Sequence, residues 1–313
     1  MVKLALVGFG RWGRRLFAAL DGTSEKTSFA TVVLRPDSVA LGLVPRWKTQ
    51  VVTDYRSMLD DPSIDGVVLA TPPSGHKHEV LAAIQAGKHV YVEKPLALTL
   101  AEAEEIVAVS SKAKIILAVG FNRRFAPAFA EMKKRLDAGE IGDLLHLDAN
   151  FSGLMTAPVR TSWRLSPMEN PAGPMTPRGI HVLDAMIALG GPASVVWARL
   201  DKTGPVKDLA TRAYAHLEFA GQVSGNLVSI QETSEFYRVQ ALGSKGILEQ
   251  EGHFILHWRP LRRVSTTMRF DDIDLERAAL EGFADAIRGE AGFPVTMAEV
   301  LNGVAVMERM ARS

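Results

Sequence analysis

The sequence lacks cysteine entirely, although it runs to 313 residues. Disulfide bonds, metal sites built on thiolates and a cysteine nucleophile are therefore excluded. The absence also fits a reducing compartment.

Long apolar runs and a strong net charge are missing too. The first apolar run, Leu4 to Val7, stops at Gly8 and has neither the length nor the small-residue cleavage site of a signal peptide. No segment approaches the roughly 20 apolar residues of a transmembrane helix. The formal net charge of +1 creates no field that would attract nucleic acid or an anionic membrane. We therefore expect a cytoplasmic protein that binds neither.

The composition that remains is ordinary for a globular protein, with 47% hydrophobic and 23% charged residues. The length exceeds what one small core needs and predicts two domains. No repeat, low-complexity tract or long linker stands between them.

Short apolar runs alternate with helical patterns up to about residue 120. We expect strands at residues 2–7, 29–34, 51–52, 66–70, 88–92 and 115–119. Strands that alternate with helices pair in parallel and form a doubly wound sheet. Residues 1–120 are therefore predicted to be an α/β domain of the Rossmann type.

The alternation of predicted strands and helices ends after Gly120. We expect a helix at 127–138, a strand at 144–151, a loop at 153–178, a helix from Ile180 to Gly190, several strands between 194 and 258, and two final helices. This order predicts a second α/β domain over residues 121–313, with an open, mainly antiparallel sheet covered on one face. The other face is a candidate interface for a homodimer or homotetramer. We also consider that the last helix packs back on the first domain.

The first strand is followed by a glycine motif. It reads Gly8, Phe9, Gly10, Arg11, Trp12, Gly13 and opens a helix, which is the setting that the dinucleotide fingerprint requires. The glycines permit a tight turn, close approach of a pyrophosphate and close packing of the helix. The helix N-terminus offers free N–H groups to the phosphates. A glycine-rich turn without a ligand is the weaker alternative.

The end of the second predicted strand bears on the choice of dinucleotide. An NAD-preferring domain usually has an acid there, and this sequence has Leu34 followed by Arg35. A guanidinium suits a 2′-phosphate, so NADP is the preferred cofactor. Asp37 keeps NAD open, and Arg35 is alternatively a solvated surface arginine.

A second cluster ends the 88–92 strand with Glu93, Lys94 and Pro95. A lysine at the carboxyl end of a parallel strand lies in the crevice where open α/β sheets bind ligands. Its ammonium can stabilise an alkoxide or exchange a proton.

These motifs together resemble the glucose-fructose oxidoreductase/inositol dehydrogenase/MocA (Gfo/Idh/MocA) family. The resemblance rests on the Glu-Lys-Pro segment and, in the same order along the chain, on residues 71–76, 120–127, 162–164, 179–184 and 243–246. It covers nearly the whole chain. It implies an oxidoreductase that passes a hydride between a nicotinamide and a small hydroxy or carbonyl compound such as a sugar or polyol.

The resemblance also implies site residues. Lys94 and His181 match the family's catalytic positions. Cofactor contacts are expected, besides the glycine motif and Arg35, from Thr71, Pro72, His76, Glu93 and Lys94. Substrate contacts are expected from Arg123, Trp163, Arg164, His181 and Asp184, and the substrate site is expected between the domains near Lys94, His181 and Arg164.

One position departs from the family pattern. The family's catalytic aspartate, four residues before the histidine, corresponds to Pro177. In one interpretation His181 is the acid/base, because histidine titrates near neutral pH, and Lys94 polarises the substrate oxygen. In the other, the chain is a nucleotide-binding regulator or sensor without turnover.

The role of Asp184 stays open, and the sequence predicts no metal site. Asp184 lies on the same helical face as His181 and either orients the imidazole, contacts substrate or is stabilised by the helix dipole. No metal site is expected, since His76 and His78 diverge on a helix and lack supporting carboxylates or cysteines.

Overall fold

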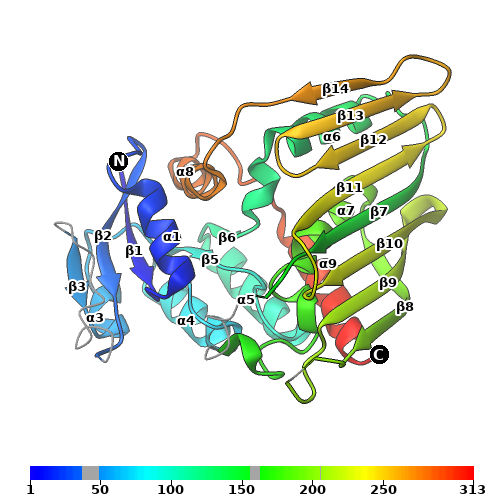
Figure 1. Ribbon diagram of the computed structural model, residues 1–313. Coiled ribbons are helices and arrows are strands. Elements are labelled where there is room, and N and C mark those ends of the chain that lie inside the picture. The colour runs from blue at the N-terminus through cyan, green and yellow to red at the C-terminus, as the bar shows by residue number, and fades with distance from the viewer. Residues whose placement is uncertain (37–48, 156–162, 205) are drawn as a thin grey trace. The chain divides into compact units, whose positions relative to one another are not determined.

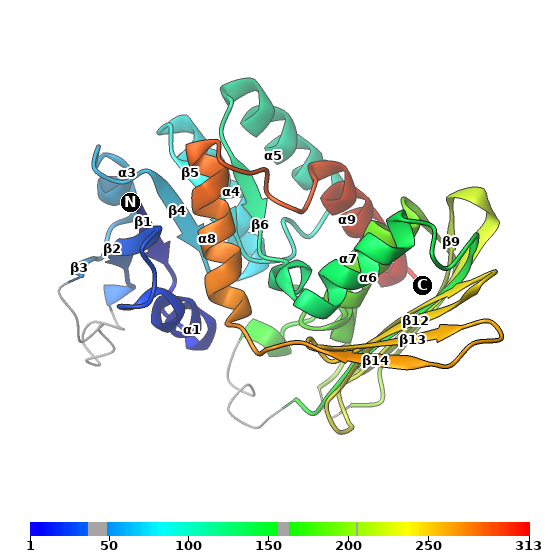
Figure 2. The ribbon, with the colours of Figure 1, turned by 90° about the horizontal axis from the view of Figure 1, so that it is seen from above.

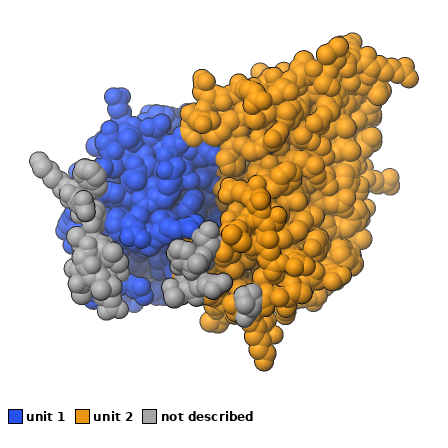
Figure 3. All heavy atoms as spheres, viewed as in Figure 1, with its two compact units in different colours: residues 1–97, 101–122, 274–296 blue, residues 98–100, 123–273, 297–313 orange. Residues whose placement is uncertain are grey.

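The computed structural model describes residues 1–36, 49–155, 163–204 and 206–313. Their contacts divide the chain into two compact units, coloured separately in Figure 3. Unit 1 comprises residues 1–97, 101–122 and 274–296, and unit 2 comprises residues 98–100, 123–273 and 297–313. No helix in the described ranges is both long and apolar enough to cross a membrane.

Unit 1 contains a six-stranded parallel sheet with the order β3-β2-β1-β4-β5-β6 (Figure 1). The strands are β1 (Val2–Val7), β2 (Thr27–Val33), β3 (Gln50–Val52), β4 (Gly66–Leu69), β5 (His89–Val92) and β6 (Leu117–Val119). The chain runs outward from β1 to β3 and then returns to β4 on the other side. This reversal of strand order puts the ligand crevice of a doubly wound sheet at the carboxyl ends of β1 and β4. The predicted Rossmann fold is confirmed.

The inner strands of unit 1, such as β1, β4 and β5, are largely buried because helices cover the sheet. The helices are α1 (Arg11–Leu20), α3 (Tyr55–Leu59), α4 (Pro73–Gln85), α5 (Leu100–Ala113) and α8 (Leu275–Arg288). Val67, Val68 and Leu69 on β4 are fully inaccessible, as the near-continuous apolar run of a parallel strand requires. The strand β2 begins two residues before the predicted start, where the hydroxyl of buried Thr27 donates to the Val2 carbonyl at 3.0 Å.

The helix α8 returns to unit 1 late in the chain and packs on α1, β2 and β5. Its Phe283 ring lies 5.8 Å from the ring of Tyr91 on β5. The final helix, α9 (Met297–Ala311), belongs to unit 2. The penultimate helix therefore belongs to the first unit and the final helix to the second.

Unit 2 is built on an eight-stranded sheet with the order β14-β13-β12-β11-β7-β10-β9-β8. The strands are β7 (Leu144–Ser152), β8 (Ala193–Asp201), β9 (Arg212–Phe219), β10 (Val223–Ile230), β11 (Phe236–Gly243), β12 (Gly246–Glu251), β13 (Ile255–Pro260) and β14 (Thr266–Arg269). All neighbours pair antiparallel except β7 and β10. Burial alternates along β9 and β11, so one face is covered and one is open, as predicted.

Helices of unit 2 lie on one side of this sheet, as Figure 2 shows for α6 and α7. The remaining elements are α6 (Pro127–Asp137), α7 (Gly179–Gly190) and the 3₁₀ turns η1 (Asn122–Phe125), η3 (Trp163–Leu165), η4 (Gly173–Met175) and η5 (Ala220–Gln222). The helix α7 is buried from Gly179 to Leu189, because it packs on the sheet and on α6 and α9. A helix that is apolar nearly all round suits such a central place.

Candidate active site

The glycine turn of unit 1 joins β1 to α1. Gly8 has a φ of +90°, and a Cβ there would lie 2.8 Å from the carbonyl oxygen of Ala70. A Cβ on Gly13 would come within 1.9 Å of the Gly8 carbonyl oxygen, so only glycine lets α1 start this close to the sheet. By contrast, a Cβ on Gly10 would meet nothing within 4 Å. The turn is thus closed on its inner side and open at Gly10, as the approach of a pyrophosphate requires.

The other residues of the turn have different surroundings. The Phe9 ring packs edge-on to Phe17 at 5.6 Å, and Arg11 is exposed at the start of α1. Arg35 is exposed just beyond β2, whereas Leu34, at the position of the usual acid, is 2% exposed. The alternative ligand Asp37 lies outside the described residues.

The segment after β4 is held by a carboxylate that the sequence did not single out. Thr71 donates its hydroxyl to the side chain of Glu79 on α4, and the Tyr55 hydroxyl donates to the Glu79 carbonyl at 2.7 Å. Burial raises the pKa of the Glu79 carboxyl, and the hydrogen bond from Thr71 opposes the shift. Pro72 precedes α4 directly as its N-cap.

His76 connects two segments at the carboxyl edge of the sheet. Its ring is fully buried, with Nδ1 2.8 Å from the Pro95 carbonyl and Nε2 3.1 Å from the Thr71 carbonyl. Carbonyl oxygens only accept hydrogen bonds, so a neutral ring satisfies one of the two and an imidazolium satisfies both. Either form ties the segment after β4 to the residue that follows Lys94.

Glu93 and Lys94 follow β5. The Glu93 side chain packs against Gly120, where a Cβ would lie 2.8 Å from its Oε1. Burial raises the pKa of the Glu93 carboxyl to about 7. The Lys94 ammonium and the Trp12 indole N–H, which lies nearby without completing a hydrogen bond, lower that pKa less than burial raises it. Glu93 therefore titrates near neutral pH beside the predicted catalytic lysine.

His181 lies in the first turn of α7 in unit 2 and is 4% exposed. Arg123 of η1 approaches it, with Nη1 3.0 Å from the imidazole Nε2. The same guanidinium lies over the Phe151 ring at 4.8 Å. The structure thus brings two predicted substrate residues into direct contact.

Asp184 has a partner that the sequence did not predict. Arg124 donates from Nε to Oδ2 at 2.6 Å and from Nη2 to Oδ1 at 2.9 Å, and also pairs with Glu299 of α9 at 3.2 Å. Burial raises the pKa of the Asp184 carboxyl, and Arg124 opposes the shift. The carboxylate therefore faces Arg124, a partner that was not considered from the sequence.

Trp163 and Arg164 form a local pair in η3. The Arg164 guanidinium stacks 4.3 Å above the Trp163 ring, and its carbonyl accepts from Asn170 at 2.9 Å. Both side chains are half-buried. Pro177 is also half-buried, two residues before α7, and offers no ionisable group.

Two family models match the chain. One, described as the oxidoreductase family with an NAD-binding Rossmann fold, matches residues 2–121, and the other, the GFO/IDH/MocA C-terminal domain, matches residues 129–249. The chain belongs to the Gfo/Idh/MocA family. The resemblance stated from the motifs is confirmed.

Named relatives of this Gfo/Idh/MocA chain include enzymes and solved complexes. It is 39% identical over 149 residues to scyllo-inositol 2-dehydrogenase (NAD(+)) of Bacillus subtilis, a match that covers 45% of this chain and 42% of that protein. Levoglucosan dehydrogenase in complex with NADH and levoglucosan has the same fold, with a TM-score of 0.89, 22% identity and coverage of 100% and 96% of the two chains. A 3-ketoreductase from Actinomadura kijaniata in complex with NADP and TDP-benzene gives a TM-score of 0.86, 21% identity and coverage of 98% and 96%. The matched stretch thus spans less than half of the Bacillus protein.

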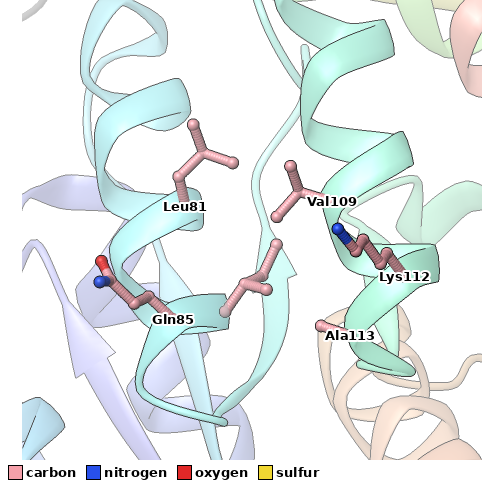
Figure 4. A pocket seen from close by; sticks show the side chains of 6 residues that line it. Leu81, Gln85, Val109, Lys112 and Ala113 are labelled. Atoms are coloured by element: carbon pink, nitrogen blue, oxygen red, sulfur yellow. The ribbon is translucent and has the colours of Figure 1, made fainter.

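A shallow depression lies elsewhere on the Rossmann unit of this family member, between α4 and α5 (Figure 4). It is lined by Leu81, Ile84, Gln85, Val109, Lys112 and Ala113. Lys112 is the one ionisable group among these six, so the lining offers no pair of groups for acid/base chemistry. Within the described ranges, no three His, Asp or Glu side chains are placed to hold a metal ion.

The structure shows contacts of site residues that the sequence did not reveal. Glu79, Arg124, Tyr237 and His253 contact predicted site residues or their neighbours. A signal existed only for Arg124, which stands in the 120–127 motif. The others carry no motif and become visible only through their contacts.

Proposed function

We propose that the chain is an NAD(P)-dependent oxidoreductase acting on a CH–OH or C=O group of a sugar, a polyol or a related small compound. The observation that supports this function is the position of Lys94 at the carboxyl edge of the parallel sheet. The glycine turn after β1, which is open at Gly10, lies at the same edge. Both lie in unit 1, and Trp12 of the turn reaches the neighbourhood of Glu93. A dinucleotide cradle and a lysine on one sheet edge suit hydride transfer.

The residues at that edge fit a dinucleotide. We assign its pyrophosphate to the N–H groups of the glycine turn and its nicotinamide end to the segment of Glu93 and Lys94, with Thr71, Pro72 and His76 shaping the adjoining wall. When bound, the nicotinamide supplies the hydride acceptor or donor. The chain's own residues orient the nicotinamide and stabilise the negative charge that develops on the substrate oxygen.

NADP is the preferred dinucleotide. Arg35 is exposed beyond β2 and the usual acidic position is the buried Leu34, so a 2′-phosphate has a cationic partner and meets no carboxylate at that position. Initial rates with NADP and NAD test this: Arg35→Ala should raise KM for NADP by about tenfold or more and leave KM for NAD nearly unchanged. A clear preference of the natural protein for NAD would contradict it.

Lys94 and His181 are the proposed catalytic residues, and Arg123, Trp163 and Arg164 the proposed substrate contacts. We assign Asp184 to its partner Arg124 instead of to substrate, because its carboxylate is 6% exposed and accepts two hydrogen bonds from that guanidinium. Pro177 leaves proton exchange to groups other than an aspartate. The relatives named as dehydrogenases do not favour the non-catalytic alternative.

A second copy of the chain is the proposed macromolecular partner, through the open face of the unit 2 sheet. Large apolar side chains are exposed on its strands, including Trp197 at 53% and Phe236 at 43%. Light scattering should find a dimer or tetramer, and Trp197→Glu should shift it toward monomer. A monomer at high protein concentration would contradict this assignment.

The function itself is tested by turnover. Purified protein is assayed at the nicotinamide absorbance band against inositols, other polyols, sugars and sugar acids, each with NADP and NAD. Reduction of either dinucleotide with at least one compound supports the proposal. Dinucleotide binding with no turnover across the panel, in both reaction directions, would favour a regulator.

A further inference from the structure

Arg123 is held in one orientation by aromatic side chains of unit 2. Its guanidinium lies 4.8 Å from the ring centre of Phe151 and 6.0 Å from that of Tyr237. The Phe151 and Tyr237 rings meet edge-on at 5.2 Å, and Tyr237 meets His253 at 4.9 Å. A planar cation stacked in this way is pre-organised and loses little freedom when it donates a hydrogen bond.

The contact between Arg123 and His181 fixes the protonation of the imidazole. The Nη1 to Nε2 distance is 3.0 Å, which is a hydrogen bond. A guanidinium has donors only and does not lose its proton, so Nε2 is the acceptor and carries none. A neutral ring with a bare Nε2 carries its proton on Nδ1.

The charges around the ring favour the same state. An imidazolium at position 181 would place a like charge within hydrogen-bond distance of Arg123, which disfavours it. The Arg178 guanidinium lies over the same Phe151 ring at 5.3 Å. Two acids of the unit, Asp184 and Glu299, are paired with Arg124.

Burial keeps two titratable side chains near Arg123, His253 and Tyr237, in their neutral forms. Burial lowers the pKa of His253 to about 4, and the charge of Arg123 lowers it further in the same direction. Burial likewise raises the pKa of Tyr237, which stays a neutral phenol. His253 and Tyr237, two neighbours of Arg123, are therefore uncharged.

We propose that Arg123 is a positioning residue that holds His181 as the neutral Nδ1–H tautomer, with Nε2 occupied by the Arg123 guanidinium. This inference rests on the proposed function, in which His181 is a catalytic residue. While the contact persists, His181 takes up no proton at Nε2.

Long-range proton–nitrogen NMR of the ¹⁵N-histidine-labelled full chain, without substrate or dinucleotide, tests the tautomer. The chain has eight histidines, so the His181 signals are identified by their loss in His181→Gln. At pH 7 we expect a protonated Nδ1 and an unprotonated Nε2 in the natural protein. In Arg123→Met the ring should mix both tautomers, because no guanidinium then occupies Nε2.

Two variants serve as controls. Arg123→Lys keeps a cationic donor and should largely restore the natural spectrum. Arg238→Met removes a guanidinium that pairs with Asp148 on the open face of the same sheet, and should leave the His181 signals unchanged.

An Nε2–H tautomer or an imidazolium in the natural protein at pH 7 would overturn the inference, and so would an unchanged spectrum in a folded Arg123→Met. If that variant does not fold, the natural spectrum and Arg123→Lys still decide. Because no turnover enters the measurement, failure of the substrate panel would be a separate result.

Discussion

Arg124 donates two hydrogen bonds to the Asp184 carboxylate, from Nε at 2.6 Å and from Nη2 at 2.9 Å. The two side chains are 5% and 6% exposed, so water competes little for either charge. The pair joins η1 to α7, the helix that carries His181. A bidentate pair of this kind fixes orientation as well as distance.

Breaking this pair should destabilise the protein strongly. Asp184→Ala removes the bidentate carboxylate partner of the buried Arg124 guanidinium and is expected to lower the free energy of unfolding by about 3–5 kcal/mol, measured by urea denaturation. Asp148→Ala is the matched control, since it breaks the half-exposed pair with Arg238 and should cost about 0–1 kcal/mol. Equal losses of unfolding free energy in the two variants would show that the buried pair contributes no more to stability than the half-exposed pair.

The glycine turn makes a prediction about binding that is separate from folding. Gly10→Ala meets nothing within 4 Å in the protein, so the fold should tolerate it, but the new methyl group stands where the pyrophosphate approaches. We expect Kd for NADPH, from fluorescence titration, to rise by about tenfold or more, which corresponds to roughly 1.4 kcal/mol.

Gly292→Ala is the control for the turn. It lies in the same unit, also meets nothing within 4 Å, and should leave Kd unchanged. A Gly10→Ala protein that binds NADPH as tightly as Gly292→Ala would remove the pyrophosphate from this turn.

Glu93 predicts how stability changes with pH. Its pKa is raised from 4.5 to about 7 by burial, so between these values the folded state binds more protons than the unfolded state. The contribution of Glu93 to stability is therefore present below pH 4.5 and is lost as the pH rises through about 7. Glu93→Gln keeps the shape against Gly120 and removes the titration.

The measurement for Glu93 is urea denaturation of the dinucleotide-free protein at several pH values from 5 to 8. The natural protein should lose stability relative to Glu93→Gln as the pH rises. A constant difference between the two proteins over that range would mean that Glu93 is ionised throughout.

The sequence predicted the parts of this structure that depend on local pattern. The apolar strands of unit 1, the glycine turn and the Lys94 segment follow from runs and motifs that a few residues carry. The partner of Asp184 did not follow, because Arg124 is 60 positions away and only folding brings the two together.

Helix packing shows the same limit. Both α8 and α9 have an apolar stripe, and the stripe alone does not say which unit it covers. The contact of Phe283 on α8 with the buried Tyr91 decides the placement of that helix. Likewise, the contact between Arg123 and His181 became visible only once their distance was known.

The central claim is that the chain is an NAD(P)-dependent oxidoreductase in which Lys94 is catalytic. Turnover with and without the Lys94 side chain tests this claim most directly. Initial rates of NADP and NAD reduction are measured over the panel of inositols, other polyols, sugars and sugar acids for the natural protein, Lys94→Met and the control Lys112→Met, whose lysine lies in the depression on α5. We predict that the natural protein and Lys112→Met turn over the same compounds and that Lys94→Met loses about 100-fold or more in kcat. Equal rates for the natural protein and Lys94→Met would contradict the account.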